Sequence, residues 1–247
     1  MQTSSGAEPN MQVSAADQRT QGTSRGGGSA KLGLAALISL VPFAWARRAL
    51  YGVLMGYRIP SSSRIGWLTV IAVSSFTVGE KVRIGSLNLF KGPIRVNIGD
   101  RSRIGRMNRF TCSWHVMQER FRDRRYTPVL TLGVDCLVLD EHYFDLFGEI
   151  SIGDGSWIAG HASQFWTHGL SVSDRDIHIG RNNYIGSAVR FAPGAAIGDY
   201  NIVSLGSVVL SKLDCQKSLI AGFPAKAIRS IEEDVASGKY RFTFEDW

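Results

Sequence analysis

The sequence predicts an all-β protein, a parallel β-helix of six-residue repeats that follows a short apolar helical segment and an N-terminal tail. Large apolar residues recur at every sixth position near the C-terminal end, and five of the six residues that follow them are small. A period of six fits neither a helix nor a simple strand. It indicates one short strand and one turn per repeat, so that three repeats close a triangular coil and stacked coils bury an apolar column. The recurring positions are 179, 185, 191, 197, 203 and 209.

Residues 1–30 are predicted to form a disordered tail. They are rich in Ser, Gly, Gln and Thr and contain no aromatic residue. A segment of this composition has too little apolar surface to offset the entropy of ordering.

Residues 31–60 are predicted to be an apolar or amphipathic helical segment. The fifteen residues 32–46 carry no charge and include Pro42, and a second apolar run follows Arg47 and Arg48. Fifteen residues are too few to span a bilayer, which takes about 20. The run also begins too far into the chain for an ordinary secretion signal and lacks a small-residue cleavage site. Two interpretations stay open: helices packed on the domain or its oligomer, or peripheral contact of residues 32–57 with a membrane surface.

Residues 61–229 are predicted to be the β-helix domain, and residues 230–247 a C-terminal extension. Upstream of position 179 the same phase recurs in four shorter pieces, interrupted near 111–130, 145–151 and 169–178, where we expect loops between coils. The pieces are Val78, Ile84 and Phe90; Ile98, Ile104 and Phe110; Leu132, Val138 and Phe144; and Ile152, Ile158 and Gln164.

The net charge limits the class of binding partner, and the cysteine content indicates the redox compartment. The net charge of +7 favours acidic partners such as phosphates, nucleotides or anionic lipid headgroups. No basic run interleaved with aromatic residues and no zinc-finger spacing indicates a nucleic-acid module. The three cysteines, Cys112, Cys136 and Cys215, lie far apart without a CxxC pair, which is typical of free thiols in a reducing compartment.

Two C-terminal stretches carry a resemblance to a known family. They read "IGRNNYIGSAVRFAPGAAIGDYNIVSLGSVV" and then "LIAGFPAKAIR". They resemble the hexapeptide-repeat acyltransferases, and in particular the sugar and polysaccharide O-acetyltransferases, over about residues 64–230. The resemblance implies a left-handed β-helix, a homotrimer, acetyl-CoA as the acyl donor, and a carbohydrate or glycolipid acceptor in surface polysaccharide or glycolipid assembly. Because acetyl-CoA is a cytoplasmic metabolite, it also implies a cytoplasmic enzyme, with the inner face of the membrane as a possible place of contact.

His168 is the predicted catalytic base. It lies in "WIAGHASQFWTHG", residues 157–169, where the resemblance aligns it with the family's catalytic histidine. An ordinary imidazole is mostly unprotonated at neutral pH and can accept a proton. A base within hydrogen-bond reach lets an acceptor hydroxyl attack the thioester of acetyl-CoA. The alternative is a structural histidine.

His142 is the second catalytic candidate. It lies in "LDEHYFD", after Asp140 and Glu141, with Asp145 three residues further on. A carboxylate can orient an imidazole, so His142 is expected either to orient the site or contact the acceptor, or to be an ordinary loop residue. For the acceptor we predict contacts from Asp145, Trp166 and Tyr184, the last of which stands where many relatives carry Trp.

The resemblance also implies a donor groove along the coil edge. Backbone amides of successive coils bind the pantetheine arm of acetyl-CoA in the family, and cations meet its phosphates. The groove residues by position are Ser187, Ala188, Ser204 and Leu205, and the cations are Lys212, Lys226 and Arg229. The insertion 117–128 carries four arginines and is either a solvated loop or an element that attracts an anionic acceptor.

Three other functions are alternatives to an O-acetyltransferase. An N-acetyltransferase of an amino sugar-nucleotide would share the fold and the base, and a non-enzymatic β-helix scaffold would need neither. A γ-class carbonic anhydrase binds zinc through three histidines, two of them separated by four residues. Here six residues separate His161 from His168, and Arg125 and Leu132 stand where the third would lie, so no metal site is predicted. His161 is expected at the surface or at a subunit interface.

Overall fold

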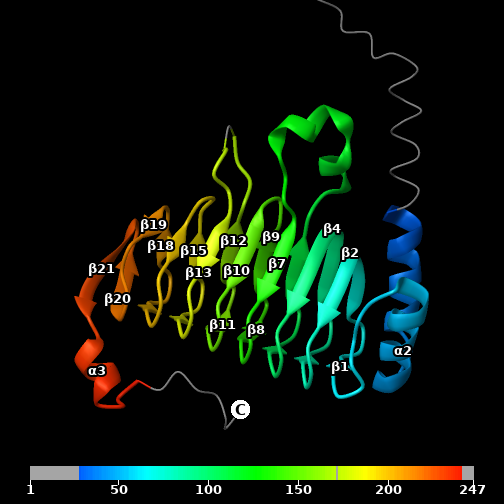
Figure 1. Cartoon of the computed structure of the whole chain (residues 1–247), viewed down its shortest axis with the longest axis horizontal. Coiled ribbons are helices and arrows are strands. Elements are labelled where there is room, and N and C mark those ends of the chain that lie inside the picture. The colour runs from blue at the N-terminus through cyan, green and yellow to red at the C-terminus, as the bar shows by residue number, and fades with distance from the viewer. Residues whose placement is uncertain (1–27, 171, 241–247) are drawn as a thin grey trace, which may run out of the picture.

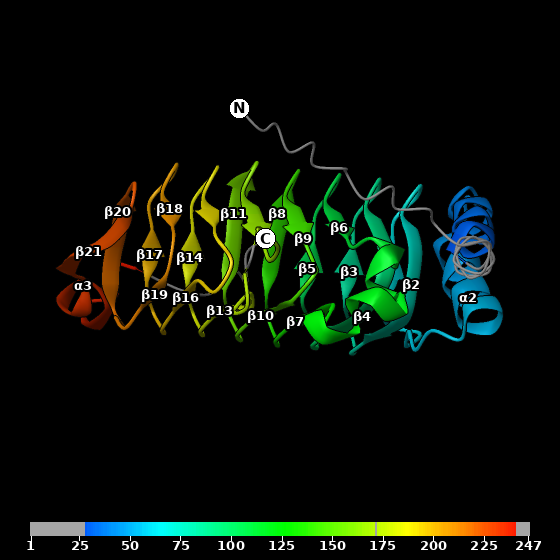
Figure 2. The ribbon, with the colours of Figure 1, turned by 90° about the horizontal axis from the view of Figure 1, so that it is seen from above.

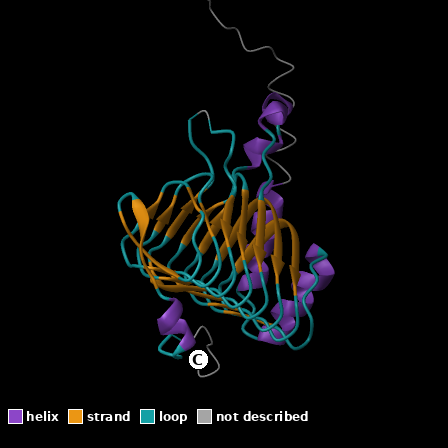
Figure 3. Ribbon diagram, turned by 60° about the vertical axis from the view of Figure 1, so that its left-hand side comes forward, coloured by secondary structure: helices purple, strands orange, loops and turns teal. Residues whose placement is uncertain are grey.

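The computed structural model describes residues 28–170 and 172–240. Short parallel strands form a three-sided coil, with two helices at its N-terminal end and a hairpin and a short helix at its C-terminal end (Figure 1). Helices are confined to these ends and to one inserted loop (Figure 3). Figures 1 and 2 together show the chain winding left-handed from the N-terminal helices toward α3. The predicted fold class is confirmed. Of the tail predicted for residues 1–30, residues 1–27 lie outside the described residues, and residues 28–30 are helical and not disordered.

Each side of the coil is one ladder of strands. The first side consists of β1 (Arg64–Ile65), β3 (Arg83–Ile84), β5 (Arg103–Ile104), β8 (Leu137–Asp140), β11 (Trp157–His161), β14 (Tyr184–Ile185), β17 (Ile202–Val203) and β20 (Ser218–Gly222). The second side consists of the first halves of β2 (Val70–Val78) and β4 (Leu89–Ile98), then β6 (Arg109–Thr111), β9 (Tyr143–Asp145), β12 (Gln164–Trp166), β15 (Arg190–Phe191) and β18 (Val208–Val209). The third side consists of the second halves of β2 and β4, then β7 (Val129–Leu132), β10 (Glu149–Ile152), β13 (Ile177–Ile179), β16 (Ala196–Ile197) and β19 (Lys212–Leu213).

The remaining elements lie outside the ladders. They are α2 (Ala44–Met55), the 3₁₀ helices η1 (Trp114–Met117) and η2 (Glu119–Arg124), β21 (Ala225–Ser230), which pairs antiparallel with β20, and α3 (Glu232–Ala236). Residues 28–39 are also helical.

The apolar column predicted from the six-residue period fills the coil. Positions 179, 185, 191, 197, 203 and 209 are all at most 4% exposed. Phenylalanines of the second side stack along the coil axis. The ring centroid of Phe110 lies 4.4 Å from that of Phe90 and 4.5 Å from that of Phe144. One predicted position is wrong: Phe165, and not Gln164, points inward, because β11 holds one extra residue between Ile158 and His161 relative to β8.

Small residues after the inward positions allow the coils to stack closely. A Cβ on Gly66 would lie 2.3 Å from the backbone of Gly85 in the next coil. The left-handed backbone of the corner falls two residues further on, at Leu87 (φ 63°) and Met107 (φ 58°). Glycine is therefore needed for the close stacking of coils and not for the bend itself.

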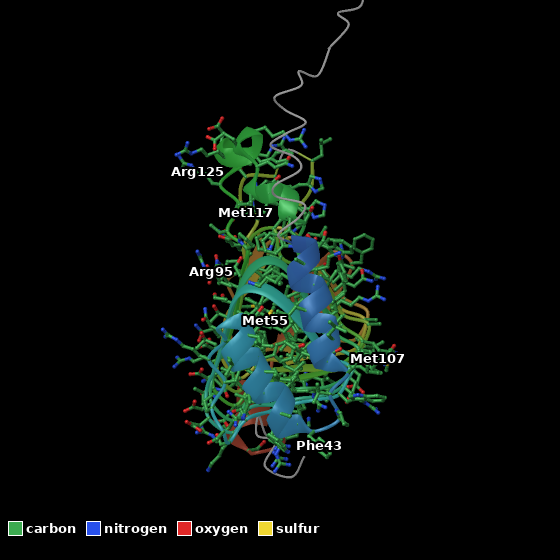
Figure 4. The ribbon with its side chains drawn as sticks, turned by 90° about the vertical axis from the view of Figure 1, so that its right-hand side faces the viewer. Phe43, Met55, Arg95, Met107, Met117 and Arg125 are labelled. Carbon is green, nitrogen blue, oxygen red and sulfur yellow. The ribbon has the colours of Figure 1, made fainter. Side chains whose placement is uncertain are left out.

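The N-terminal helices cap the first coil. The Tyr51 hydroxyl donates to the carbonyl of Thr69 at 2.8 Å, and the Arg47 guanidinium donates to the carbonyl of Ile65 at 2.9 Å. The two helices lie across the end of the coil (Figure 4). Their inner faces thus pack on the domain, whereas Trp45 (69% exposed) and Val53 (82% exposed) face outward. None of the helices among residues 28–170 and 172–240 has the length and apolarity needed to cross a membrane.

Two loops rise from the edge between the second and third sides. One is the insertion that carries η1 and η2, between β6 and β7, and the other connects β12 to β13. Both project from the same edge of the coil (Figures 1 and 2). The predicted interruptions near 111–130 and 169–178 are therefore confirmed as excursions between coils, and both border the site described next.

Candidate active site

Asp145 and His168 form a hydrogen-bonded pair where two neighbouring strands end. β9 and β12 run parallel with Asp145 opposite Trp166, so the chain beyond β12 leaves the coil beside Asp145. The His168 Nδ1 atom lies 2.6 Å from Asp145 Oδ2. The Asp145 side chain is 3% exposed and that of His168 is 47% exposed. A carboxylate accepts a hydrogen bond at Nδ1–H, so a neutral imidazole here carries its lone pair on the other nitrogen, Nε2.

The surroundings of this pair hold it in place. The Thr167 hydroxyl accepts the backbone N–H groups of Phe147 at 2.8 Å and Gly148 at 2.9 Å, and it donates to the carbonyl of Asp145. The Phe147 ring packs on the imidazole of His168 with ring centroids 4.3 Å apart. Burial raises the pKa of Asp145, and hydrogen bonds from His168 and Thr167 oppose that rise. The geometry therefore presents one imidazole nitrogen to a ligand in a fixed orientation.

His168 and Asp145 line a cavity of about 660 Å³. Its floor is the second side of the coil, and its other walls come from the insertion and from the start of the first helix. The indole of Trp114 lies against Gly28, where an added Cβ would come within 3.1 Å of it. Sequence reasoning missed most of this cavity. The lining residues not foreseen include Lys91, Arg109, Thr111, Trp114 and Tyr143.

The register of the β-ladder could have found three of them. Arg109 and Tyr143 each come directly before an inward-pointing phenylalanine, and they are opposite each other in β6 and β9. Thr111 is opposite Asp145 in the same pair of strands. Stacking the six-residue repeats in register therefore places these three outward side chains beside Asp145.

His142 lies away from this pair. It is 1% exposed, its backbone N–H donates to Asn108 Oδ1 at 2.8 Å, and its Nδ1 accepts the N–H of Ser163 at 3.1 Å. Asn88 Oδ1 accepts the N–H of Asn108 in the same way one coil earlier. Burial lowers the pKa of His142 to about 4. Within the described residues no hydrogen bond joins His142 to Asp145 or His168, and the geometry favours the structural alternative for it.

The predicted acceptor residues are only partly brought together. Trp166 ends the strand next to Asp145, and its ring lies 4.9 Å from that of Tyr143 between centroids. Tyr184 is 39% exposed but lies on the first side of the coil, where its ring contacts Trp157 at 6.1 Å. Asp145 and Trp166 therefore border His168, and Tyr184 does not.

The predicted donor residues fall into two groups. Ser187 and Ala188 form the corner between β14 and β15, and Ser204 and Leu205 form the corner of the next coil, where Leu205 is 78% exposed. The N–H of Gly206 donates to the carbonyl of Ser187 at 2.9 Å, so the two corners adjoin.

Of the predicted donor cations, Lys226 lies close to the second corner, because it is opposite Ala221 in β20 and the N–H of Ser204 donates to the carbonyl of Ile220. Lys212 on β19 forms an ion pair with Asp174 at 3.0 Å. Lys226 and Arg229 are on β21, and Arg229 forms an ion pair with Asp234 at 2.8 Å.

Two other chemistries have little support in the described part of the chain. Burial raises the pKa of the thiols of Cys112 and Cys136 to about 12, which leaves them poor nucleophiles. Across residues 28–170 and 172–240, no three His, Cys, Asp or Glu side chains are grouped as metal ligands. His161 is exposed, in agreement with the predicted surface position. His178 is also exposed, and its Nδ1 lies 2.7 Å from the Ser151 hydroxyl.

The fold and the site together define a class of protein, the left-handed β-helices that carry an Asp–His pair at a coil edge beside a cavity. No family model matches the chain. It is 35% identical over 79 residues to "Putative acetyltransferase SACOL2570" of Staphylococcus aureus (strain COL), a stretch that is 29% of this chain and 39% of that protein. It is 39% identical over 61 residues to "Putative acetyltransferase SAV2555" of strain Mu50 / ATCC 700699, covering 25% of this chain and 30% of that protein. The chain thus spans less than half the length of these relatives.

Two solved structures follow a similar course of the chain. The hexapeptide-repeat containing acetyltransferase VCA0836 from Vibrio cholerae has a TM-score of 0.43 and 19% identity, over 85% of this chain and 93% of its own. The polysialic acid O-acetyltransferase OatWY has a TM-score of 0.47 and 20% identity, over 71% of this chain and 84% of its own. Likeness at this level does not transfer an activity or a substrate. The resemblance to hexapeptide-repeat acetyltransferases seen in the sequence is confirmed.

Proposed function

We propose that this protein is an acetyl-CoA-dependent O-acetyltransferase that acts on a sugar hydroxyl, with His168 as general base. The observation that carries the proposal is the Asp145–His168 pair, which leaves Nε2 of a half-exposed imidazole at the wall of a cavity large enough for a sugar. Similarity to acetyltransferases over 79 residues supports the same reaction class.

The proposed reaction requires few groups of the chain beyond the side chains of Asp145 and His168. His168 Nε2 removes the proton of the acceptor hydroxyl as its oxygen attacks the thioester carbonyl. Asp145 holds the imidazole in the tautomer that accepts this proton and stabilises its charge afterwards. The carbon–sulfur bond then breaks and the proton passes to the departing thiolate, so the products are an acetyl ester and free coenzyme A.

The donor is expected along the adjoining corners of Ser187 and Leu205. These corners are open on one side, since Leu205 is 78% exposed. We propose that a neighbouring copy in a homotrimer supplies the second wall. Lys226 remains the predicted phosphate contact, whereas Lys212 and Arg229 must leave their carboxylate partners to bind phosphate. The need for acetyl-CoA places the reaction in the cytoplasm, and contact of residues 32–57 with a membrane stays a prediction.

The test offers acetyl-CoA with matched hydroxyl and amino sugars as acceptors. Transfer is measured from the release of free thiol and from the mass of the product. We expect an acetyl ester, and we expect His168→Ala to lower kcat by about 100-fold or more. His178→Ala is the control, because His178 is an exposed histidine on the third side that contacts Ser151. An acetamide product would show the N-acetyltransferase alternative. Transfer that is equally fast in His168→Ala would contradict the role of the imidazole.

A further inference from the structure

The cavity beside His168 contains two cations that the reaction itself does not need. Lys91 and Arg109 both line it, on the neighbouring strands β4 and β6. Neither residue was a sequence-based candidate. The inference below concerns the acceptor and rests on the proposed function.

The β-ladder fixes how far these cations are from the base. Lys91 is opposite Thr111, and Thr111 is opposite Asp145, so the three form one row across β4, β6 and β9. Neighbouring strands lie about 4.8 Å apart, so the backbone of Lys91 is about 10 Å from that of Asp145. Arg109 lies in the adjoining row, opposite Tyr143. The two cations and His168 thus lie along one face of the coil and line the same cavity.

Nothing among the described residues neutralises these cations. The side chains of Lys91 and Arg109 take part in no ion pair or hydrogen bond with residues 28–170 or 172–240. Among residues 28–170 and 172–240, Asp145 is the one acid that lines the cavity, and its carboxylate is held by His168 and Thr167. The cavity therefore has a positive potential that a bound anion would balance.

The rest of the wall suits a polyhydroxylated ring. The hydroxyls of Thr111 and Tyr143 lie 3.1 Å apart between the cations and the Asp145–His168 pair. Trp114 comes over the cavity from the insertion, and an aromatic face of this kind packs well on the C–H surface of a sugar. Among the described residues that line the cavity, the insertion contributes Trp114, His115 and Gln118 and none of its four arginines.

We propose that the acceptor is an anionic sugar, whose carboxylate or phosphate is bound by Lys91 and Arg109 while a hydroxyl about one ring away faces His168. Charge-assisted hydrogen bonds from two cations would give both affinity and orientation, because they fix one end of the ring. Neutral sugars of the same shape lack this anchor and bind more weakly.

The test compares three probes that differ in charge: methyl glucoside, methyl glucuronide and glucose 1-phosphate. Their dissociation constants are measured on the full chain by saturation-transfer NMR without acetyl-CoA, so that binding is read apart from transfer. The variants are Lys91→Gln and Arg109→Gln. The matched control is Arg83→Gln, which removes the same charge from an exposed position on the first side of the coil. Thermal unfolding checks that each variant is folded.

We expect at least one anionic probe to bind about ten-fold more tightly than methyl glucoside. Lys91→Gln and Arg109→Gln should each abolish most of that preference, and Arg83→Gln should keep it. The two anionic arms tell a carboxylate from a phosphate. Equal binding of neutral and anionic probes, or a preference that survives both variants, overturns the inference.

The same variants separate this inference from the proposed function. If His168→Ala abolishes transfer while the anionic preference is absent, the O-acetyltransferase stands and the anionic acceptor is wrong. If the preference depends on Lys91 and Arg109 but no acetyl group is transferred to any sugar, the anion site stands and the proposed function is wrong.

Discussion

Asp145 is almost fully buried, and the cost of burying its charge is offset by His168 and by the backbone of Thr167. Burial raises its pKa, and the hydrogen bonds from those two residues act in the opposite direction. A buried carboxylate with so few partners is stable only while the imidazole stays beside it. Asp145, which we propose orients the base, is therefore itself held in place by His168.

This mutual support predicts the effect of Asp145→Asn. An amide keeps the size of the side chain but no longer selects the Nδ1–H tautomer, so kcat should fall by about 100-fold while KM changes little. Steady-state kinetics measure both constants. Asp199→Asn is the control, because Asp199 forms an ion pair with Arg181 away from the site. A rise in KM of about 100-fold without loss of kcat would mean that Asp145 binds the acceptor instead of positioning His168.

His142 predicts a pH dependence of stability. Its pKa of about 4 in the folded protein lies below the ordinary 6.5, so between these pH values the unfolded chain binds a proton that the folded chain does not. The free energy of unfolding should thus be unaffected above pH 6.5 and fall by about 3 kcal/mol as the pH drops toward 4. Urea unfolding at pH 7, 6, 5 and 4 measures it. In His142→Gln that part of the pH dependence should be lost; if it persists, another group is its source.

At the scale of elements, each strand is too short to be stable alone, and stacking of coils supplies what the strands lack. The phenylalanine column shows this most clearly. Phe90, Phe110 and Phe144 come from three successive strands of the second side, and each is 0% exposed. The centroid of the Phe110 ring lies 4.4 Å from that of Phe90 and 4.5 Å from that of Phe144, so the Phe110 ring packs against both neighbouring coils.

Phe110→Ala should therefore lower the free energy of unfolding by about 3 to 5 kcal/mol. Phe110→Leu, which keeps much of the volume, should cost about 1.5 kcal/mol or less. Urea unfolding followed by circular dichroism measures both. Val53→Ala is the control, because Val53 is 82% exposed and its truncation should change stability by less than about 0.5 kcal/mol. A small effect of Phe110→Ala would show that the coils stack independently of this ring.

The same scale explains what the sequence could and could not predict. The period of six between positions 179 and 209 is uninterrupted, so inward positions there followed directly. The same strict period predicts an inward Gln164, and this is wrong because one extra residue between Ile158 and His161 in β11 shifts the phase. His168 was found through resemblance, whereas its contact with Asp145 depends on the register of two strands. The cavity was missed because Gly28 and Trp114, far apart in the chain, meet only when the first helix lies beside the insertion.

At the scale of the whole molecule, the coil is capped at its N-terminal end, and exposed apolar side chains lie both on the capping helices and along one corner of the coil. Arg47, Tyr51 and Tyr57 close the first coil with hydrogen bonds to its carbonyls. The corner between the first and second sides, by contrast, leaves apolar side chains in solvent. An exposed row of this kind is a feature of a surface that another chain covers.

This row predicts how copies of the chain associate. Its members are Trp67 (51% exposed), Leu87 (49%) and Met107 (41%), and Figure 4 shows Met107 at one edge of the coil. The N–H of Leu87 donates to the carbonyl of Trp67 and the N–H of Met107 to that of Ser86, so these three adjoin from coil to coil. Leu205 (78% exposed) lies on the same corner four coils further along. We expect a homotrimer that buries this row, because three copies around an axis parallel to the coil would bring each row against a neighbour and close the donor groove.

Light scattering after gel filtration should accordingly give three times the chain mass of 27.1 kDa. Met107→Glu should shift the protein toward the monomer and, at concentrations where it is monomeric, raise the KM for acetyl-CoA, because the donor groove loses its second wall. Lys81→Glu is the control, since Lys81 is an exposed corner residue between the third and first sides and its change keeps the row intact. A wild-type monomer that transfers acetyl groups at full rate would contradict the trimer, and a trimer unaffected by Met107→Glu would place the interface on another face.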